Sequence, residues 1–349
     1  MVEKIVITKE DLEKETIKSG TTKTYPTVKE YPKVEYTPDA IYSGKKQQIF
    51  SSKNIMQYII AGLIGGFIAW MVTEIFWSEH RNVSSNVLVD MALWGGVMTA
   101  LIGGCIASSE GIVTQSSEKA IKDGVIGLGI GFIGGFFGGF FGQTLYSFLG
   151  GGKVKSIGLQ IFARTIGWGL LGAFVGIAQG IVVKSLKKMM NATIGGLIGG
   201  LVGGFLFDPI GIIIGGGTIS RIVAIPVLGT TIGYAISMVE ELSKSAWIQI
   251  IKGPMTGKQF ILYKPETSIG SSPKNDIPIL KDSGIAPKHA VIKRTGNTSI
   301  IMSVFNQPVA VNGSFVPSRR LSNNDQIQLG NTVLLYSEKV ITEKKSGYG

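Results

Sequence analysis

Long apolar runs, separated by short polar stretches, occupy the middle of the chain. A membrane-spanning helix needs roughly 20 mostly apolar residues. Six runs approach that length: Ile55–Trp77, Val87–Ser108, Val125–Leu149, Ile157–Val183, Ala192–Ile214 and Ile219–Val239. The pattern predicts an α-helical transmembrane domain over residues 55–240. Asp208 and Pro209 interrupt the fifth run, which predicts a short helix and then a turn, and leaves open whether residues 192–214 span fully.

A different pattern begins at Trp247, where short β-prone stretches alternate with turn signals such as Asn312-Gly313. The stretches are Gln259–Tyr263, Ile277–Leu280, Ala290–Lys293, Ser299–Val304, Gln326–Leu329 and Val333–Tyr336. This spacing predicts a small sandwich or barrel over residues 247–338. The remaining residues, 339–349, are expected to form a disordered C-terminal tail.

The first 54 residues are rich in Lys, Glu, Thr and Pro, and contain one aliphatic cluster. Such a segment buries too little apolar surface to offset its ordering entropy, which predicts a disordered polar tail over residues 1–54. Residues 21–27 carry several hydroxyl groups that are candidate phosphorylation sites, and a plain solvated tail is the alternative. The start of the chain lacks the apolar core of a signal peptide, so we expect this tail to stay where it is synthesised.

Glycines recur every four residues in the third and fifth runs. One series is Gly127, Gly131, Gly135 and Gly139, and the other runs through the pairs that start at Gly195, Gly199 and Gly203. A spacing of four places residues on one helix face, where the absence of side chains lets two backbones approach closely in lipid. We therefore predict glycine-zipper packing within the chain, with a homo-oligomer interface as the alternative.

The basic residues indicate the topology. The chain has a formal net charge of +11, and cytoplasmic loops of membrane proteins are enriched in Lys and Arg. Loops around Lys119 and Lys122 and around Lys187 and Lys188 fall on the same side as the Lys-rich N-terminal tail. Six spans then place both termini in the cytoplasm, and the protein in the cytoplasmic membrane. Lysines in the predicted loop at residues 150–156 oppose this bias.

Ionisable residues within the apolar runs are the usual sign of a transport pathway. The candidates are Glu74, Asp90, Arg164, Asp208 and Arg221. Arg164 lies roughly two helical turns inside the fourth run, and we expect it to pair with Glu74 or Asp90 on a neighbouring helix. Most of the others lie near span ends, where water or lipid headgroups solvate them. A structural ion pair is therefore the prediction, and a transport site is the alternative.

The sequence contains no catalytic constellation. It has two histidines and a single cysteine, Cys105, and none of them forms a cluster with metal-ligand spacing. The glycine-rich runs lack the Gly-Lys-Ser/Thr ending of a phosphate-binding loop. We therefore predict no enzyme activity, no metal and no cofactor. The basic charge is explained by topology and anionic lipid headgroups, so no nucleic-acid partner is expected.

The β-rich segment resembles the forkhead-associated (FHA) family over roughly residues 258–338. The matching motifs, in the family's order, are Ile269-Gly270, Asn275-Asp276-Ile277, His289-Ala290-Val291-Ile292, Val311-Asn312-Gly313 and Asp325-Gln326-Ile327-Gln328-Leu329-Gly330. The resemblance implies an eleven-stranded β-sandwich whose loops at one end read phosphothreonine peptides. It also implies structural roles for Gly270, Asn275, His289 and Gly313.

The phosphate-reading positions of that family are altered here. Its arginine after the Ile-Gly pair falls on Ser271, and its serine before the histidine falls on Ala286. Its peptide-binding asparagine falls on Gln307 or, with a gap, on Asn306. Serine cannot supply the two-pronged hydrogen bonding that arginine gives a phosphate. The candidate peptide-binding residues are Ser271, Lys274, Lys288, Arg294, Asn306, Gln307 and Asn312.

Together these features predict a membrane-anchored signalling or scaffold protein that recruits a protein partner through a cytoplasmic FHA-like domain. The partner is either a Ser/Thr-phosphorylated peptide, an unphosphorylated protein or the chain's own N-terminal tail. The alternative is a channel or transporter regulated by that domain. The lipid bilayer is the remaining expected partner.

Overall fold

The computed structural model describes residues 51–77, 83–149 and 157–339 of the 349-residue chain. All of them belong to one compact unit, residues 37–349. The predicted disordered tails lie outside the described residues, except for residues 51–54 and 339. The predicted loop lysines between residues 150 and 156 also lie outside them.

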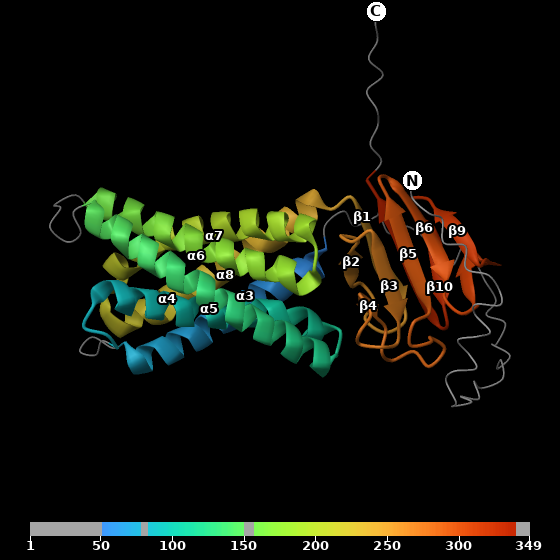
Figure 1. The fold of residues 1–349 in the computed structure, drawn as a ribbon, viewed down its shortest axis with the longest axis horizontal. Helices are drawn as coiled ribbons and strands as arrows, with labels where there is room; N and C mark the ends of the chain where they lie inside the picture. The colour runs from blue at the N-terminus through green and yellow to red at the C-terminus, as the bar shows by residue number, and fades with distance from the viewer. Residues whose placement is uncertain (1–50, 78–82, 150–156, 340–349) are drawn as a thin grey trace, which may run out of the picture. The chain divides into compact units, whose positions relative to one another are not determined.

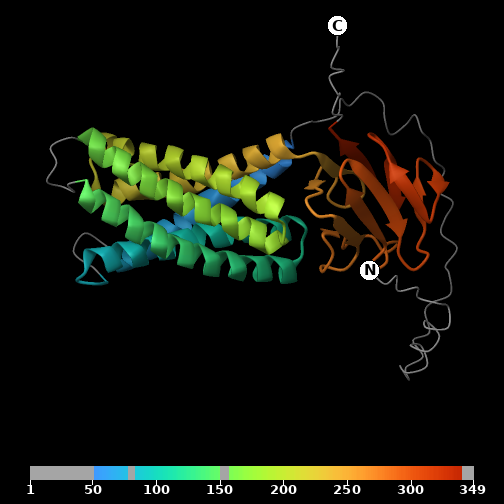
Figure 2. The ribbon, with the colours of Figure 1, turned by 45° about the horizontal axis from the view of Figure 1, so that its top comes forward.

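Six long helices form the first part of the described chain, and they run beside one another in Figures 1 and 2. They are α3 (Ser52–Phe76), α4 (Val87–Val113), α5 (Ser117–Phe148), α6 (Ile157–Val183), α7 (Leu186–Ile214) and α8 (Gly217–Ser243). By length and composition, all six are apolar and long enough to cross a membrane. The six predicted spans are therefore confirmed as long apolar helices.

Polar caps make several helices longer than the apolar runs. Ser116 accepts a hydrogen bond from the backbone N–H of Lys119, and Ser185 accepts one from that of Lys188. Such caps satisfy N–H groups that have no partner within the helix. As a result, Lys119, Lys187 and Lys188, which were predicted to lie in loops, lie in the first turns of α5 and α7, and Lys122 lies in the second turn of α5.

Helix α7 corrects the prediction for the fifth run. It continues without a break through Asp208 and Pro209, and ends at Gly215, whose φ of 91° is left-handed. The predicted turn at residues 208–209 was therefore wrong. Membrane helices tolerate an internal proline because neighbouring groups satisfy the freed backbone. Asp208 also has an ion-pair partner on α6, Arg164, which removes the need for it to reach the membrane surface.

The two glycine-rich helices contact neighbouring helices of the same chain. On α5, a Cβ added at Gly131 would lie 2.6 Å from the carbonyl oxygen of Thr99 on α4. On α7, a Cβ at Gly196 would collide with the backbone of Gly172 on α6, and one at Gly195 would collide with Ile236 on α8. These backbones lie close together because glycine has no side chain, whereas the energetic weight of glycine-zipper packing stays a prediction.

The second part of the described chain is a sandwich of two β-sheets whose strands are mostly antiparallel, and both sheets are visible in Figure 1. One sheet has the order β2-β1-β11-β10-β7-β8, and the other has the order β4-β3-β5-β6-β9. The strands are β1 (Ala246–Lys252), β2 (Gln259–Ile261), β3 (Glu266–Gly270), β4 (Ile277–Pro278), β5 (Ala290–Thr295), β6 (Thr298–Ser303), β7 (Val309–Val311), β8 (Ser314–Phe315), β9 (Ser318–Leu321), β10 (Gln326–Leu329) and β11 (Thr332–Glu338). Eleven strands are the number that the FHA resemblance implies.

Alternating apolar residues of the two sheets fill the space between them. Ile248 and Leu334 from one sheet and Ile292 and Ile301 from the other are almost completely buried in one cluster. This burial fixes the strand register, because a shift by one residue would turn these side chains outward. The loops that join the strands are thereby held in fixed positions.

The glycine contacts predict a sharp difference between two alanine substitutions. Gly196→Ala places a methyl group against the backbone of α6, whereas Gly129→Ala, also within a helix, meets no heavy atom within 4 Å. Both gain helix propensity, but only the first overpacks an interface, at a cost of about 1–3 kcal/mol. Thermal unfolding of the full chain in detergent should show a lowered midpoint for Gly196→Ala alone. Equal midpoints would exclude close packing at Gly196.

Candidate functional site

Three loops of the sandwich converge at one end of strands β3, β4, β5, β6 and β7. The N–H of Ser271, after β3, donates to the carbonyl oxygen of Ala286 at 2.9 Å, which joins the β3–β4 and β4–β5 loops. The N–H of Val304, after β6, donates to the carbonyl oxygen of His289 at 3.0 Å. These bonds bring together the loops that the sequence predicted to bind a peptide.

His289 is completely buried beneath these loops. Its Nδ1 accepts a hydrogen bond from the N–H of Ala286 at 3.1 Å, so its Nε2 carries the proton and donates to the carbonyl oxygen of Pro308 at 2.9 Å. Burial lowers the pKa of His289 below its usual value, although the bond to Pro308 opposes this shift. His289 therefore fixes the spacing of two loops as a neutral ring.

Asn275 supports the same loops from the other side. Its side-chain amide donates to the carbonyl oxygens of Ser272 and Pro287, at 2.9 and 2.6 Å. A side chain at Gly270 would collide with the carbonyl oxygen of Pro287, so the close approach at this position requires glycine. Each of these residues contacts other loop residues rather than projecting from the loops.

Asn312 belongs to a turn between β7 and β8. Its amide donates to Asp325 at 2.8 Å, and its oxygen accepts a hydrogen bond from the N–H of Gln326 at 2.9 Å. Both Asn312 and Gly313 have positive φ, at 50° and 79°. The structure thus shows Asn312 bonded to the sandwich, and its predicted contact with a peptide stays a prediction.

The remaining candidate residues divide into two groups. Lys274, Lys288 and Asn306 are exposed on the converging loops, whereas Ser271 and Gln307 are half-buried there. Arg294 is not with them. It lies near the opposite end of β5, where its Nη1 donates to Ser245 Oγ at 3.0 Å. The prediction grouped Arg294 with the loop residues because it is close to Lys288 in sequence. The six-residue strand β5 separates the two in space.

Two features of the loops were missed by sequence reasoning. Phe305 is 87% exposed, and both it and Asn306 have positive φ, at 51° and 54°. Asp276 accepts hydrogen bonds from the Lys264 ammonium and from Ser268. Burial alone would raise the pKa of Asp276, but the hydrogen bonds from Lys264 and Ser268 outweigh it, so its pKa lies below the usual value. Asp276 belongs to the motif Asn275-Asp276, which was the sequence signal that could have indicated its hydrogen bonds.

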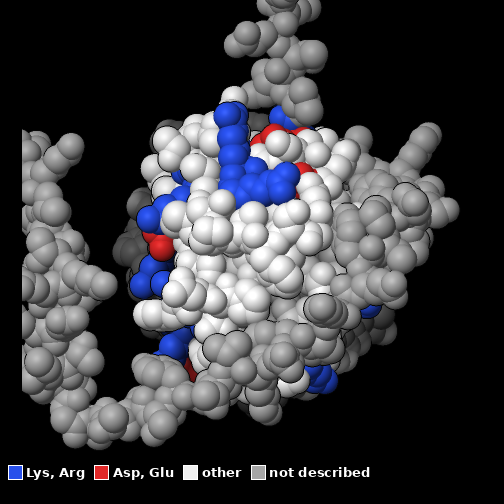
Figure 3. Space-filling model, turned by 90° about the vertical axis from the view of Figure 1, so that its right-hand side faces the viewer, with Lys and Arg blue, Asp and Glu red and all other residues white. Residues whose placement is uncertain are grey.

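Charge is sparse on one face of the molecule. In Figure 3 the described part of this face is mostly white, with Lys and Arg at the top, along the left edge and at the lower corners, and few acidic atoms. The formal charge of +11 is therefore not concentrated in a broad basic surface on this face.

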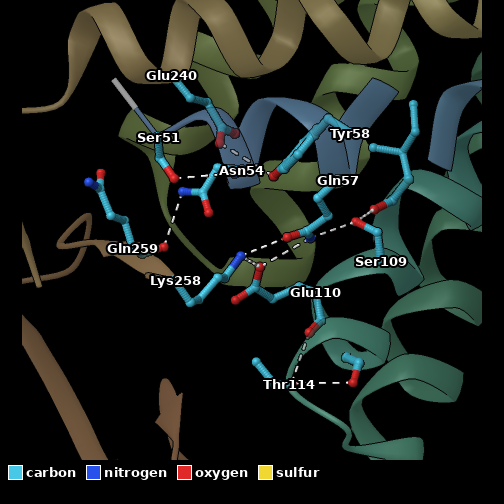
Figure 4. A network of polar contacts seen from close by, with 12 residues as sticks. Ser51, Asn54, Gln57, Tyr58, Ser109, Glu110, Thr114, Glu240, Lys258 and Gln259 are labelled. Atoms are coloured by element: carbon cyan, nitrogen blue, oxygen red, sulfur yellow. Dashed lines mark hydrogen bonds and ion pairs between the residues drawn. The ribbon is translucent and has the colours of Figure 1, made fainter. Parts of the chain in front are cut away.

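Buried polar contacts join the sandwich to the ends of two helices, as Figure 4 shows. Lys258, which precedes β2, is 4% exposed, and its Nζ lies 2.7 Å from Gln57 Oε1 on α3 and 3.0 Å from Glu110 Oε2 on α4. Beside it, the Asn54 amide donates to the carbonyl oxygen of Gln259 at 3.1 Å. A buried ammonium with two oxygen acceptors positions the sandwich against these helices. No sequence signal set Lys258 apart from the other lysines.

The intramembrane charges are paired, but not as predicted. Arg164 Nη1 lies 2.7 Å from Asp208 Oδ1 on α7, and Arg221 makes two hydrogen bonds to the Glu74 carboxylate, at 2.9 and 2.8 Å. The expected pairing of Arg164 with Glu74 or Asp90 was therefore wrong. The prediction of partners did not name Asp208, which lies on the next helix along the chain. Asp90 instead accepts hydrogen bonds from the Trp77 ring and from two backbone N–H groups.

Across residues 51–77, 83–149 and 157–339, no three His, Cys, Asp or Glu side chains form a group that could hold a metal ion. His80 lies outside these residues. The described site consists of three converging loops of the sandwich and the polar contacts between them. Its side chains are suited to binding through hydrogen bonds, two lysine charges and an exposed aromatic ring.

The buried neutral state of His289 predicts a pH dependence of sandwich stability. As the pH falls through about 6.5, the unfolded chain takes up a proton that native His289 resists, so the free energy of unfolding decreases. Thermal unfolding of the full chain between about pH 8 and about pH 5.5 should show this loss. The loss should shrink in His289→Gln, which has no titrating group there. An equal loss in the variant would contradict this role.

The sandwich matches a known family and several known proteins. Residues 249–339 match the family described as "Inner membrane component of T3SS, cytoplasmic domain". Glycogen accumulation regulator GarA of Mycolicibacterium smegmatis is 35% identical over 104 residues, which cover 29% of this chain and 65% of the relative. The oxoglutarate dehydrogenase inhibitor of Corynebacterium jeikeium is 32% identical over 97 residues, which cover 26% and 64%. The chain thus spans just under two thirds of the length of these curated relatives.

Similar solved structures cover the same part of the chain. The FHA domain of CT664 from Chlamydia trachomatis is 25% identical, with a TM-score of 0.26 over 28% of this chain and 99% of that one. The cytoplasmic domain of the T3SS sorting platform protein PscD from P. aeruginosa is 19% identical, with a TM-score of 0.25 over 28% and 82%. The matching motifs, the eleven strands and the family match agree. In this chain, six long apolar helices are followed by an FHA-type β-sandwich.

Proposed function

We propose that this chain is a membrane-anchored scaffold or signalling protein that recruits a protein partner through the converging loops of its FHA-type sandwich. The observation that carries this proposal is the loop arrangement: buried His289 and Asn275 hold three loops together, while Lys274, Lys288 and Phe305 project from them. An exposed aromatic ring on a fixed loop is a common anchor in protein interfaces.

The chemistry of these loops favours a partner whose binding depends weakly on phosphate. Ser271 replaces the arginine of the family pattern, and a hydroxyl cannot make the paired charged hydrogen bonds of a guanidinium. Lys274 and Lys288 supply charge near the same loops, but a lysine acts as a point charge on a flexible stem. The proposed partner therefore contacts Phe305 and the loop backbones, with phosphate adding a modest gain.

The cytoplasmic placement of the sandwich and of both termini belongs to this proposal. The family that matches residues 249–339 is described as a cytoplasmic domain of an inner-membrane component, which supports it. The chain's own N-terminal tail remains a candidate ligand on the same side of the membrane. Addition of phosphorylated and plain tail peptides to the protein tests that candidate.

The serine at position 271 predicts a gain of function. Full-length protein in nanodiscs, probed with a phosphothreonine peptide array and its unphosphorylated duplicate, should discriminate between the two less than tenfold. Ser271→Arg should raise the preference for phosphopeptides roughly tenfold, because a charged hydrogen bond contributes about 1.5–3 kcal/mol. Ser322→Arg makes the same change on an exposed residue after β9, at the end of the sandwich opposite to these loops, and is the matched control. No peptide binding by either protein would exclude phosphothreonine recognition.

A channel or transporter regulated by the sandwich is the second candidate function. A cavity of about 700 Å³ within the helical bundle favours it, because residues near Arg164 and Asp208 line this cavity. If solutes cross there, Arg164→Ala should reduce flux through reconstituted liposomes, whereas Gly129→Ala should not. Equal flux with and without protein, across ions and small solutes, would exclude this function.

A further inference from the structure

The cavity lies within the helical bundle itself. Residues of α4, α5, α6, α7 and α8 line it together with Trp77, which follows α3. Its volume of about 700 Å³ falls within the range of small-molecule sites in proteins. It lies at the helix ends opposite to Gln57 and Glu110, so it is separate from the junction with the sandwich.

Aromatic rings form much of the cavity wall. The rings of Trp94 and Trp168 meet edge to face, with centroids 5.6 Å apart, and the Phe207 ring lies 5.0 Å from that of Trp168. Glycines leave room beside these rings. A Cβ added at Gly211 would meet no heavy atom within 4 Å. The wall therefore offers a broad apolar surface with space for an apolar chain or ring.

One edge of the cavity is charged. Arg164 pairs with Asp208 through Nη1 at 2.7 Å, and its guanidinium lies 5.5 Å from the centre of the Tyr146 ring. Half of the Arg164 side chain nevertheless stays exposed. A guanidinium has five N–H donors, and the pair with Asp208 engages those of Nη1, which leaves Nη2 and Nε for a second acceptor.

We propose that this cavity binds an amphiphile with an anionic head, whose apolar part lies against Trp94, Trp168 and Phe207 and whose carboxylate or phosphate pairs with Arg164. The aromatic wall accommodates such a chain through many van der Waals contacts. The second face of the guanidinium favours an oxyanion over a hydroxyl. A bilayer lipid and a soluble amphiphile share this chemistry.

The tryptophans that line the cavity allow a direct test of amphiphile binding, with the full chain in phosphatidylcholine nanodiscs. Terminally brominated dodecanoate quenches nearby tryptophan fluorescence, and Trp77, Trp94 and Trp168 line the cavity. We expect saturable quenching in the wild type. Gly211→Leu places a side chain in the open space of the cavity and should weaken binding at least roughly tenfold. Gly129→Leu, which also meets open space but does not line the cavity, should bind like the wild type.

The charged edge is tested by a second pair of measurements. Arg164→Gln is combined with Asp208→Asn, so that no carboxylate loses its partner. The double variant should bind the brominated carboxylate about tenfold more weakly, and brominated dodecanol unchanged. Repeating the titration with phosphatidylglycerol in the nanodisc distinguishes a bilayer lipid from a soluble amphiphile as the natural ligand. Weaker apparent binding identifies a bilayer lipid as the occupant, and unchanged binding identifies a soluble amphiphile.

Two results would overturn the proposal. One is equal quenching in the wild type and Gly211→Leu, which would place the probe in bulk lipid rather than in the cavity. The other is equal affinity of the wild type for the carboxylate and the alcohol, which would remove the role of Arg164. Thermal unfolding of each variant shows that it is folded, and position 211 is chosen because a Cβ added there meets no heavy atom within 4 Å.

Discussion

A charged side chain removed from water costs several kcal/mol unless an opposite charge or hydrogen bonds compensate it, and this constraint governs both ends of the helical bundle. At one end, Lys258 of the sandwich lies between Gln57 and Glu110. At the other, Arg164 pairs with Asp208 across two helices. The first contact fixes where the sandwich meets the helices. The second forms part of the charged edge of a cavity whose wall is also lined by aromatic rings.

Between these ends, the helices rely on close backbone contact. The backbones of α6 and α7 lie close together at Gly196 and Gly172. Because apolar side chains gain little from meeting one another in lipid, the prediction is that such glycine contacts hold the two helices together. The same residue type has a second consequence. At Gly211, where an added Cβ would meet no heavy atom within 4 Å, the missing side chain leaves open space beside the helix. The glycine-rich sequence thus accounts both for tight helix pairs and for the cavity beside Trp168.

The sequence predicted those features that depend on periodicity and composition. Six apolar runs became six helices, and the motifs around His289 and Asn312 located the FHA-type sandwich. Features that depend on three-dimensional neighbours were not predictable. The partner of Arg164 was missed because the pair with Asp208 depends on how α6 packs against α7, which no local sequence pattern shows. Lys258 was missed because its role depends on groups about 150–200 residues away in the sequence. Pairings of this kind have no local pattern.

Buried polar contacts around Lys258 hold the FHA-type sandwich against the helical bundle. A double-mutant cycle with Lys258→Met, Glu110→Gln and both changes tests this claim most directly. The readout is the opening free energy of the amides of residues 257–259, measured by hydrogen exchange on the full chain in nanodiscs. The account predicts a coupling energy of about 1–2 kcal/mol between the two positions. Additive effects, with no coupling, would contradict it, because the two side chains would then not meet in the folded protein.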